Sequence, residues 1–295
     1  MANLQPKEEF IGGAGGLRMF MRSWRGDEKP RAIVAIVHGE NSHSGYYEWA
    51  GEQFAARGLS AYAIDLHGRG RSEGERFYVR RMRDYVEDVE MLVQLVKVRE
   101  PKVPVFLLGH GGGGVISATY TLARQAELSG FICESMAFEL AAPPFLMSAM
   151  KGMSMLAPHM KVLRLKNEDF TRDPRVLKQM NDDPLIKNER QPVKTVAEIQ
   201  RADKRLGREF GKIALPLLIL HGTGDKTARP HGSTTFFERA GSPDKTLKFY
   251  EGRLHDLLGD IGREQVLNDI VNWIDPRLSP WHRAAAAFGQ REANA

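Results

Sequence analysis

Short apolar runs alternate with longer segments of helical periodicity along most of the chain. A run of consecutive apolar residues predicts a strand buried on both faces, and apolar positions three and four residues apart predict an amphipathic helix. The expected strands are 32–37, 60–65, 105–108, 131–135, 215–220 and 246–250. The expected helices are 48–57, 84–98 and one that follows the glycines at 109–114 and continues to about residue 126. This alternation predicts an α/β protein with a largely parallel sheet covered on both faces.

The alternation stops between residues 136 and 212, where no strand is evident and methionine, proline and charged residues are frequent. We interpret 136–212 as a helical cap inserted into a core formed by residues 1–135 and 213–280. Flexible thioether side chains suit an adaptable apolar surface, which favours a small-molecule ligand such as an apolar ester or an acyl chain. Ordinary core methionines of a small helical subdomain explain the same residues equally well. Residues 281–295 are rich in alanine and predict a disordered tail.

The composition narrows the class of protein. With 295 residues, of which 42% are hydrophobic, the chain is long enough for one large α/β domain with an insertion, or for two modest domains. The formal net charge is +5, but lysine and arginine are scattered, with one local concentration at 80–83. Nucleic-acid binding calls for a basic stripe with interleaved aromatic residues, so we expect no nucleic-acid partner.

Cysteine usage and hydropathy indicate the compartment. The single cysteine, Cys133, lies in an expected strand, so an internal disulfide is excluded and a reducing compartment is favoured. The first residues lack an apolar leader, and no later stretch approaches the length that spans a bilayer. We therefore expect a cytoplasmic protein without stable membrane insertion, and the sequence leaves its oligomeric state open.

Gly111 lies where a nucleophile is expected. An apolar strand, a turn of small residues and a helix form the setting of the Gly-x-Ser-x-Gly nucleophile elbow, yet the central position here carries no side chain. Two later strands are followed by an acid and a base, namely Asp225 after 215–220 and His255 after 246–250. Because the carboxyl ends of parallel strands meet at one edge of a sheet, we expect these three positions to lie together.

Five ordered motifs carry a resemblance to a known family. They are His-Gly-Glu-Asn-Ser-His-Ser-Gly-Tyr at 38–46, Asp-Leu-His-Gly-Arg-Gly-Arg-Ser-Glu-Gly at 65–74, Leu-Gly-His-Gly-Gly-Gly at 108–113, His-Gly-Thr-Gly-Asp at 221–225 and Gly-Arg-Leu-His-Asp at 252–256. Over roughly residues 20–274 the chain resembles the α/β-hydrolase superfamily, and within it the group of monoacylglycerol lipases, lysophospholipases and serine aminopeptidases. The resemblance implies a mostly parallel sheet of the eight-stranded type, flanked by helices, with an inserted helical cap.

The resemblance also implies a role for each site position. A serine at 111 would attack an ester carbonyl, His255 would accept its proton, and Asp225 would orient and stabilise the imidazolium. The backbone N–H groups of Glu40 and Gly112 would form the oxyanion hole. Only the serine is missing, although Gly112 is a second departure because the family often has a larger residue there.

Three further histidines lie near the expected site, namely His38, His43 and His110. We expect His38 and His43 to hydrogen-bond nearby loops and His110 to be structural, rather than to transfer protons. The nine histidines of the chain form no cluster with ligand spacing, so neither a metal nor another cofactor is expected.

The missing serine changes the expected activity. Without a hydroxyl at 111 no acyl-enzyme can form, and in a serine protease the loss of the serine alone lowers kcat by about 10⁶-fold. The sequence therefore predicts a protein of the carboxylic ester hydrolase type, inactive or strongly impaired as written. A non-catalytic pseudo-hydrolase that binds an acyl or small apolar ligand is the alternative. Natural drift and deliberate inactivation both explain the glycine.

A dinucleotide-binding protein is a rival from another class. The glycines at 109–114 also satisfy Gly-x-Gly-x-x-Gly between a strand and a helix, and Glu134 follows at the spacing of a ribose-binding acid. This interpretation leaves the motif at 38–39, Asp225 and His255 unexplained, so we rank it below the hydrolase.

Overall fold

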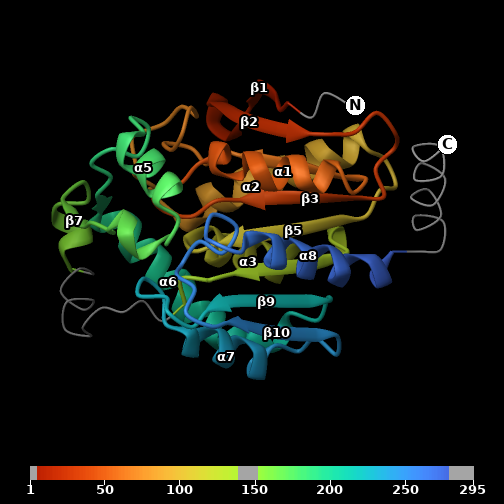
Figure 1. Ribbon diagram of the computed structural model, residues 1–295. Coiled ribbons are helices and arrows are strands. Elements are labelled where there is room, and N and C mark those ends of the chain that lie inside the picture. Colours follow the sequence, from red (N-terminus) through yellow and green to blue (C-terminus); the bar gives the residue numbers. More distant parts are fainter. Residues whose placement is uncertain (1–4, 139–151, 279–295) are drawn as a thin grey trace.

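The computed structural model describes residues 5–138 and 152–278, and its centre is an eight-stranded sheet (Figure 1). The strand order is β1-β2-β4-β3-β5-β6-β9-β10. The bounds are β1 Lys7–Gly12, β2 Arg18–Trp24, β3 Ala32–Val37, β4 Leu59–Ile64, β5 Val105–His110, β6 Gly130–Glu134, β9 Leu217–Gly222 and β10 Lys245–Tyr250. From β4 to β10 every neighbouring pair is parallel, whereas β2 runs antiparallel to β1 and β4. The predicted α/β fold with a mostly parallel sheet is confirmed.

The hairpin of β1 and β2 was not expected from the sequence. In β1 the side chains alternate between exposed and partly exposed, because this strand forms the edge of the sheet and pairs only with β2. Such a strand lacks the continuous apolar run of a central parallel strand. The strands β5 and β9 also extend two residues beyond their predicted ends, because His110 pairs with Glu134 and His221 pairs with Phe249. Because the last residues of these strands are histidine and glycine, the hydrophobicity pattern does not predict that they continue the strand.

Helices cover both faces of the sheet (Figure 1). Their bounds are α1 Glu48–Ala55, α2 Met82–Arg99, α3 Gly112–Arg124, α6 Val193–Glu209, α7 Pro230–Arg239 and α8 Arg263–Ile274. On β3, Ile33 and Ala35 pack in a core with α2, α3, α6 and α7, whereas Val34 and Ile36 pack in a second core with α1 and α8. The two-residue period of the strand therefore divides one apolar run between two hydrophobic layers.

The region between β6 and α6 lies beyond the carboxyl ends of the parallel strands (Figure 1). It contains α5 (Pro174–Asp182) and a two-stranded antiparallel sheet of β7 (Lys161–Leu163) and β8 (Gln191–Pro192). The expectation that 136–212 contains no strand is therefore wrong, because two strands this short leave no periodic pattern in the sequence. The predicted cap residues 139–151 and the predicted tail lie outside the described residues.

A buried ion pair joins this cap to the core. Arg69, in the loop after β4, lies 2.6 Å from Glu189 and donates to Gln191 at 2.8 Å, and all three residues are buried. A buried charge pair costs desolvation, and loss of one partner leaves the other charge uncompensated. The pair therefore fixes the cap strand β8 to the edge of the sheet that carries the candidate site.

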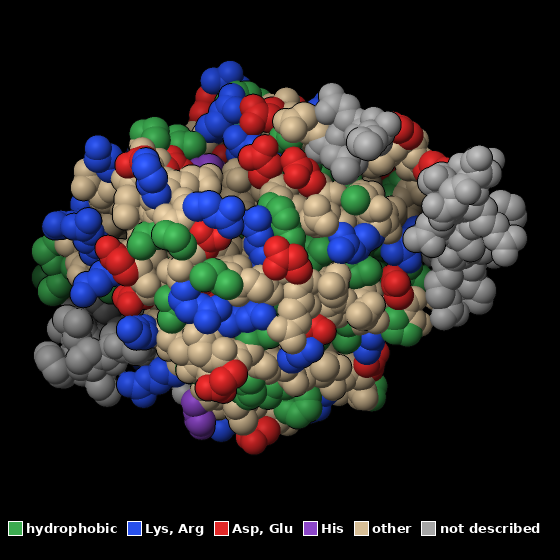
Figure 2. Space-filling model, viewed as in Figure 1, with side chains coloured by type: hydrophobic (Ala, Val, Ile, Leu, Met, Phe, Trp, Pro, Cys, Tyr) green, Lys and Arg blue, Asp and Glu red, His purple; other side chains and the backbone are tan. Residues whose placement is uncertain are grey.

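The charge distribution on the surface is mixed. On the face in Figure 2, lysine and arginine side chains are interspersed with aspartate and glutamate rather than gathered in a stripe. Among the described helices, none combines the length and apolar character needed to span a bilayer.

Candidate active site

Gly111 forms a sharp turn between β5 and α3. Its φ of +55° and ψ of −122° strain any residue with a side chain, and glycine adopts them freely. Its N–H donates to the carbonyl of Glu134 at 3.0 Å, and its carbonyl accepts the N–H of Gly114 at 3.0 Å. A Cβ at this position would lie 3.0 Å from Nε2 of His255, so the turn directs residue 111 at the imidazole.

His255 and Asp225 form a hydrogen-bonded pair. Nδ1 of His255 lies 2.7 Å from Oδ2 of Asp225, and both side chains are buried. The other oxygen, Oδ1, accepts the N–H groups of Thr227 at 2.8 Å and Ala228 at 3.0 Å. Oδ2 also lies 2.9 Å from Nε2 of His221. Asp225 is therefore held from both sides in a position that fixes the orientation of the imidazole.

The ionisation of the pair follows from this geometry. Burial opposes the charge of Asp225, but His255 and His221 outweigh it and hold the pKa of the carboxyl below its usual value. Burial likewise opposes protonation of His255, but Asp225, followed by Glu40, raises the pKa of the imidazole above its usual value. The site favours an imidazolium next to a carboxylate, as a hydrolase base requires after it has accepted a proton.

The cap holds the loop of His255 in place. The N–H of His255 lies 3.4 Å from the carbonyl of Asp169, and the N–H of Asp256 donates to the carbonyl of Phe170 at 2.9 Å. The ring of Phe170 packs edge-on against the imidazole, with the centroids 5.0 Å apart. The sequence predicts no role for Phe170, because an isolated aromatic residue in the cap carries no motif.

Glu40 places its side chain, and not only its backbone, in the site. Its Oε2 accepts the N–H of Gly112 at 3.2 Å. A Cβ at 112 would overlap the Glu40 carboxylate, so a side chain there would displace the carboxylate from this position. The donor that we expected in an oxyanion hole is therefore hydrogen-bonded to a side chain of the protein itself. The sequence predicts a role only for the backbone of Glu40, so this side-chain contact was not expected.

His38 and His43 support the loop that carries Glu40. His38 accepts the N–H of Leu66 at Nε2 and donates from Nδ1 to the carbonyl of Gly39 at 2.8 Å, and burial lowers its pKa to about 4. Nε2 of His43 lies 2.7 Å from Oδ2 of Asp183 in the cap. These contacts tie the loop to the segment that follows β4 and to the cap.

His110 forms a cluster with Glu134 and Asp256, in which one imidazole nitrogen and two carboxylate oxygens lie within 4.8 Å of one another; His110 and Glu134 are buried and Asp256 is half-buried. Burial lowers the pKa of His110 to about 3, raises that of Asp256 to about 6 and raises that of Glu134 well above its usual value. Oε1 of Glu134 accepts the N–H groups of Leu257 and Leu258. The sequence spacing did not predict this juxtaposition, which sets three titratable groups directly behind His255.

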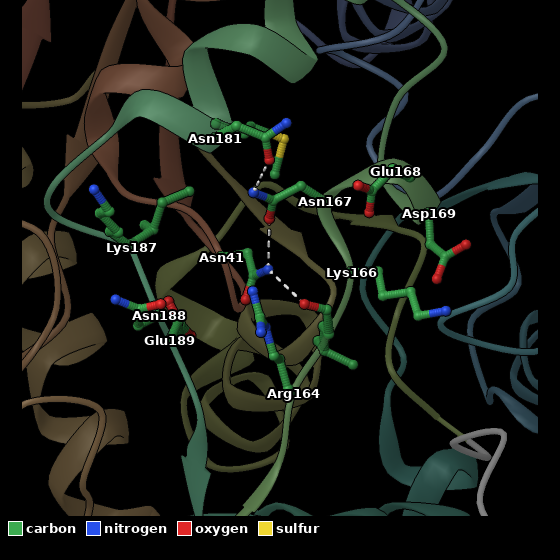
Figure 3. Close-up of a pocket in the computed structure, with 13 residues that line it drawn as sticks. Asn41, Arg164, Lys166, Asn167, Glu168, Asp169, Asn181, Lys187, Asn188 and Glu189 are labelled. Atoms are coloured by element: carbon green, nitrogen blue, oxygen red, sulfur yellow. Dashed lines mark hydrogen bonds between the residues drawn. The ribbon is translucent and has the colours of Figure 1, made fainter.

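Two cavities adjoin the site. The larger, of about 800 Å³, is lined by Asn41 and by polar and charged cap residues (Figure 3). Asn41 donates to Oδ1 of Asn167 at 2.8 Å and to the carbonyl of Leu165 at 3.2 Å. The smaller, of about 20 Å³, is lined by Glu40 and mainly by apolar side chains, and it has room for about one water molecule. Leu165 borders both cavities.

The fold and the site define the class. A mostly parallel eight-stranded sheet, a strand-turn-helix elbow after β5, and an acid and a histidine after β9 and β10 are the features of an α/β-hydrolase. Residues 28–262 match the family model described as serine aminopeptidase S33, and the chain belongs to this family.

Several similar proteins are named as lipases. The monoacylglycerol lipase of Mycolicibacterium smegmatis is 30% identical over 280 residues, which cover 94% of this chain and 100% of that protein. The monoglyceride lipase of Homo sapiens is 31% identical over 271 residues, covering 90% and 89%. The crystal structure of the monoacylglycerol lipase of Paleococcus ferrophilus superposes with a TM-score of 0.79 at 26% identity, covering 88% of this chain and 99% of that one. The chain is thus similar to hydrolases over nearly its whole length.

Proposed function

We propose that this chain is a hydrolase-type protein of the carboxylic ester class whose own ester turnover is negligible. The observation that carries the proposal is Gly111, which points at His255 but offers no hydroxyl to attack an acyl carbon. His255 and Asp225 would supply the base and its orienting acid, as in a serine hydrolase. The ligand would be a small apolar ester or an acyl group, in line with the lipase names of the relatives.

Glu40 supports the same proposal independently. In acyl transfer the carbonyl oxygen becomes negatively charged and needs vacant N–H donors. Here Gly112 already donates to a carboxylate, so an approaching oxyanion would meet both a used donor and a negative charge. Ester hydrolysis is thus impaired at two points.

Hydrolysis of p-nitrophenyl butyrate and of a monoacylglycerol tests the proposal. We expect rates no higher than those of a His255→Gln control. Turnover comparable to that of an ordinary esterase would contradict it.

The second candidate function is an acyl-binding pseudo-hydrolase, and the occupied N–H of Gly112 favours it because binding alone needs no oxyanion hole. Its test is retention of a fatty acid or fatty ester by the purified protein, detected by mass spectrometry after solvent extraction.

The dinucleotide alternative is less well supported, because the glycines have a packing role. A Cβ at Gly113 would overlap the carbonyls of Val37 and His38, and one at Gly109 would lie 2.7 Å from Oγ of Ser117. Titration with NADH tests it.

A further inference from the structure

The cluster of His110, Glu134 and Asp256 has no part in ester hydrolysis. His110 and Glu134 are directly paired in the parallel strands β5 and β6, so their side chains leave the same face of the sheet. Asp256 joins them from the loop that follows β10. One imidazole nitrogen and two carboxylate oxygens of these residues lie within 4.8 Å of one another. Nitrogen and oxygen atoms of these types are metal ligands.

Two atoms of the cluster lack a hydrogen-bond partner within the described residues, namely Nδ1 of His110 and Oε2 of Glu134. His110 is 1% exposed and Glu134 is 0% exposed, so neither atom is hydrated from the surface. A buried polar atom without a partner is costly, because it has lost its contacts with water and gained none in return. Both atoms can offer a lone pair, which a cation accepts.

The tautomer of His110 suits a metal ligand. Its Nε2 lies 3.3 Å from the carbonyl oxygen of His255, and a carbonyl accepts only from an N–H group. Nε2 therefore carries the proton, and Nδ1 presents its lone pair. Metal-binding histidines are commonly held in this way, with the second nitrogen donating to a backbone carbonyl.

The two carboxylates are supported in the same manner. Oε1 of Glu134 accepts the N–H groups of Leu257 at 2.7 Å and Leu258 at 3.1 Å, which leaves Oε2 free. Oδ1 of Asp256 accepts the N–H of Gly259 at 2.8 Å. Carboxylates that bind metals are likewise oriented by hydrogen bonds to the surrounding protein. The cluster thus has the supporting contacts that hold the ligands of a metal ion.

The charges of the cluster favour a divalent cation. Burial disfavours the charge on Glu134, and the nearby carboxylate of Asp256 disfavours it further. Two buried carboxylates this close cannot both be charged without a counter-charge. A shared proton neutralises only one of them, whereas a divalent ion balances both.

We propose that His110, Glu134 and Asp256 bind one divalent transition-metal ion, for which zinc is the probe. Zinc accepts imidazole together with carboxylate ligands, whereas magnesium and calcium take mainly oxygen. Cys133 is excluded as a ligand, because it points to the opposite face of β6 and packs in the core with α2 and α3. The inference goes beyond the proposed function and requires neither an ester nor a nucleophile.

The dimensions of the cluster fit this ion. Zinc bonds of about 2.0–2.2 Å let one ion bridge ligand atoms up to about 4.3 Å apart, so atoms within 4.8 Å need only a small inward movement. Asp256 is half-buried, and its side lets the ion enter from solvent. Three protein ligands leave a fourth position for water, as zinc commonly has.

The ion would stabilise the loop that presents His255. Asp256 directly follows His255 in the chain, and the rings of His110 and His255 lie with their centroids 4.8 Å apart. Bound zinc would therefore join the ends of β5 and β6 to this loop. The sequence does not reveal the site, because its ligands come from three separate segments of the chain.

Zinc binding by the untagged wild type tests the proposal. The protein is treated with EDTA, freed of EDTA, mixed with excess zinc chloride at neutral pH and passed through a gel-filtration column. We expect one retained zinc ion per chain by mass spectrometry of the metal, and a higher melting temperature than in EDTA, because the ion binds the folded state. Zinc K-edge absorption spectra should show nitrogen and oxygen ligands and no sulfur.

Two conservative variants locate the ion. Glu134→Gln and Asp256→Asn each keep an oxygen that can accept the same backbone N–H groups but lose the carboxylate charge. Loss of a supporting contact alone weakens a metal site by about 10-fold to 100-fold, so loss of a ligand should weaken zinc binding by at least about 100-fold. The matched control is Glu75→Gln, which removes the carboxylate 2.6 Å from His159 in an exposed pair and should bind zinc like the wild type.

Several results would overturn the proposal: no retained zinc, a sulfur ligand, or unchanged affinity in both cluster variants. Loss of binding in Glu75→Gln would do the same, since it would move the ion to the surface. If a variant does not fold, the zinc content and the absorption spectrum of the wild type still decide. In EDTA the cluster holds a proton in place of the ion, so stability measured without metal describes the metal-free protein. Ester turnover is measured separately, so the two proposals succeed or fail independently.

Discussion

Restoring the serine by itself should not restore an esterase. Gly111→Ser places a hydroxyl beside Nε2 of His255, since the Cβ would lie 3.0 Å from that atom and a shift of a few tenths of an ångström accommodates it. The carboxylate of Glu40 still occupies the N–H of Gly112. Loss of one oxyanion-hole donor costs about 100-fold to 1000-fold in kcat, equivalent to about 2.7–4 kcal/mol.

The double variant Gly111→Ser with Glu40→Ala should therefore exceed Gly111→Ser by about 100-fold or more in kcat/KM for p-nitrophenyl butyrate. Glu40→Ala alone should gain nothing, because it lacks a nucleophile, and so the two substitutions should be strongly non-additive. Adding His255→Gln to the double variant should abolish the gain.

Folding must be checked in parallel. A side chain at φ of +55° and ψ of −122° costs about 1–3 kcal/mol of stability, so the melting temperature of Gly111→Ser should fall. If Gly111→Ser is as active as the double variant, the Glu40 carboxylate does not block the oxyanion hole, and the reasoning is refuted.

Further predictions concern stability. Burial raises the pKa of Asp256 from 3.8 to about 6, so the folded state prefers the protonated carboxyl group. The contribution of this protonation to the free energy of unfolding is fully present below pH 4 and is lost as the pH rises through 6. Asp256→Asn should therefore be more stable than the wild type at pH 8, by about 2 kcal/mol, with little difference at pH 4; an equal difference at both pH values in urea titrations would refute this. Gly113→Ala should lower stability by about 1–3 kcal/mol through overlap with backbone carbonyls, whereas the control Gly12→Ala, with nothing within 4 Å, should change it little; equal melting temperatures would contradict the packing argument. Arg69→Met leaves Glu189 buried without its partner and should cost about 3–5 kcal/mol, and limited proteolysis should then cut the cap first; unchanged stability would show that the pair does not fix the cap.

The pattern along the chain predicted the central strands because each is an uninterrupted apolar run with helices on either side. It failed for the hairpin of β1 and β2 and for the two short strands of the cap, whereas β10, at the other edge of the sheet, was predicted. The strand β1 is partly exposed and borders only β2, and β7 and β8 span three and two residues. These elements exist because of their pairing partners, so no local pattern reveals them.

The sequence by itself determined the fold class, the order of elbow, acid and histidine, and the absence of a hydroxyl at 111, because these depend on local residue type and on strand order. Only the tertiary structure decided what fills the site. The Glu40 side chain reaches Gly112 across 72 positions of the chain, and Phe170 reaches His255 from the cap. Which group occupies a cavity depends on how distant segments pack, and a period of two or 3.6 residues carries no information about that.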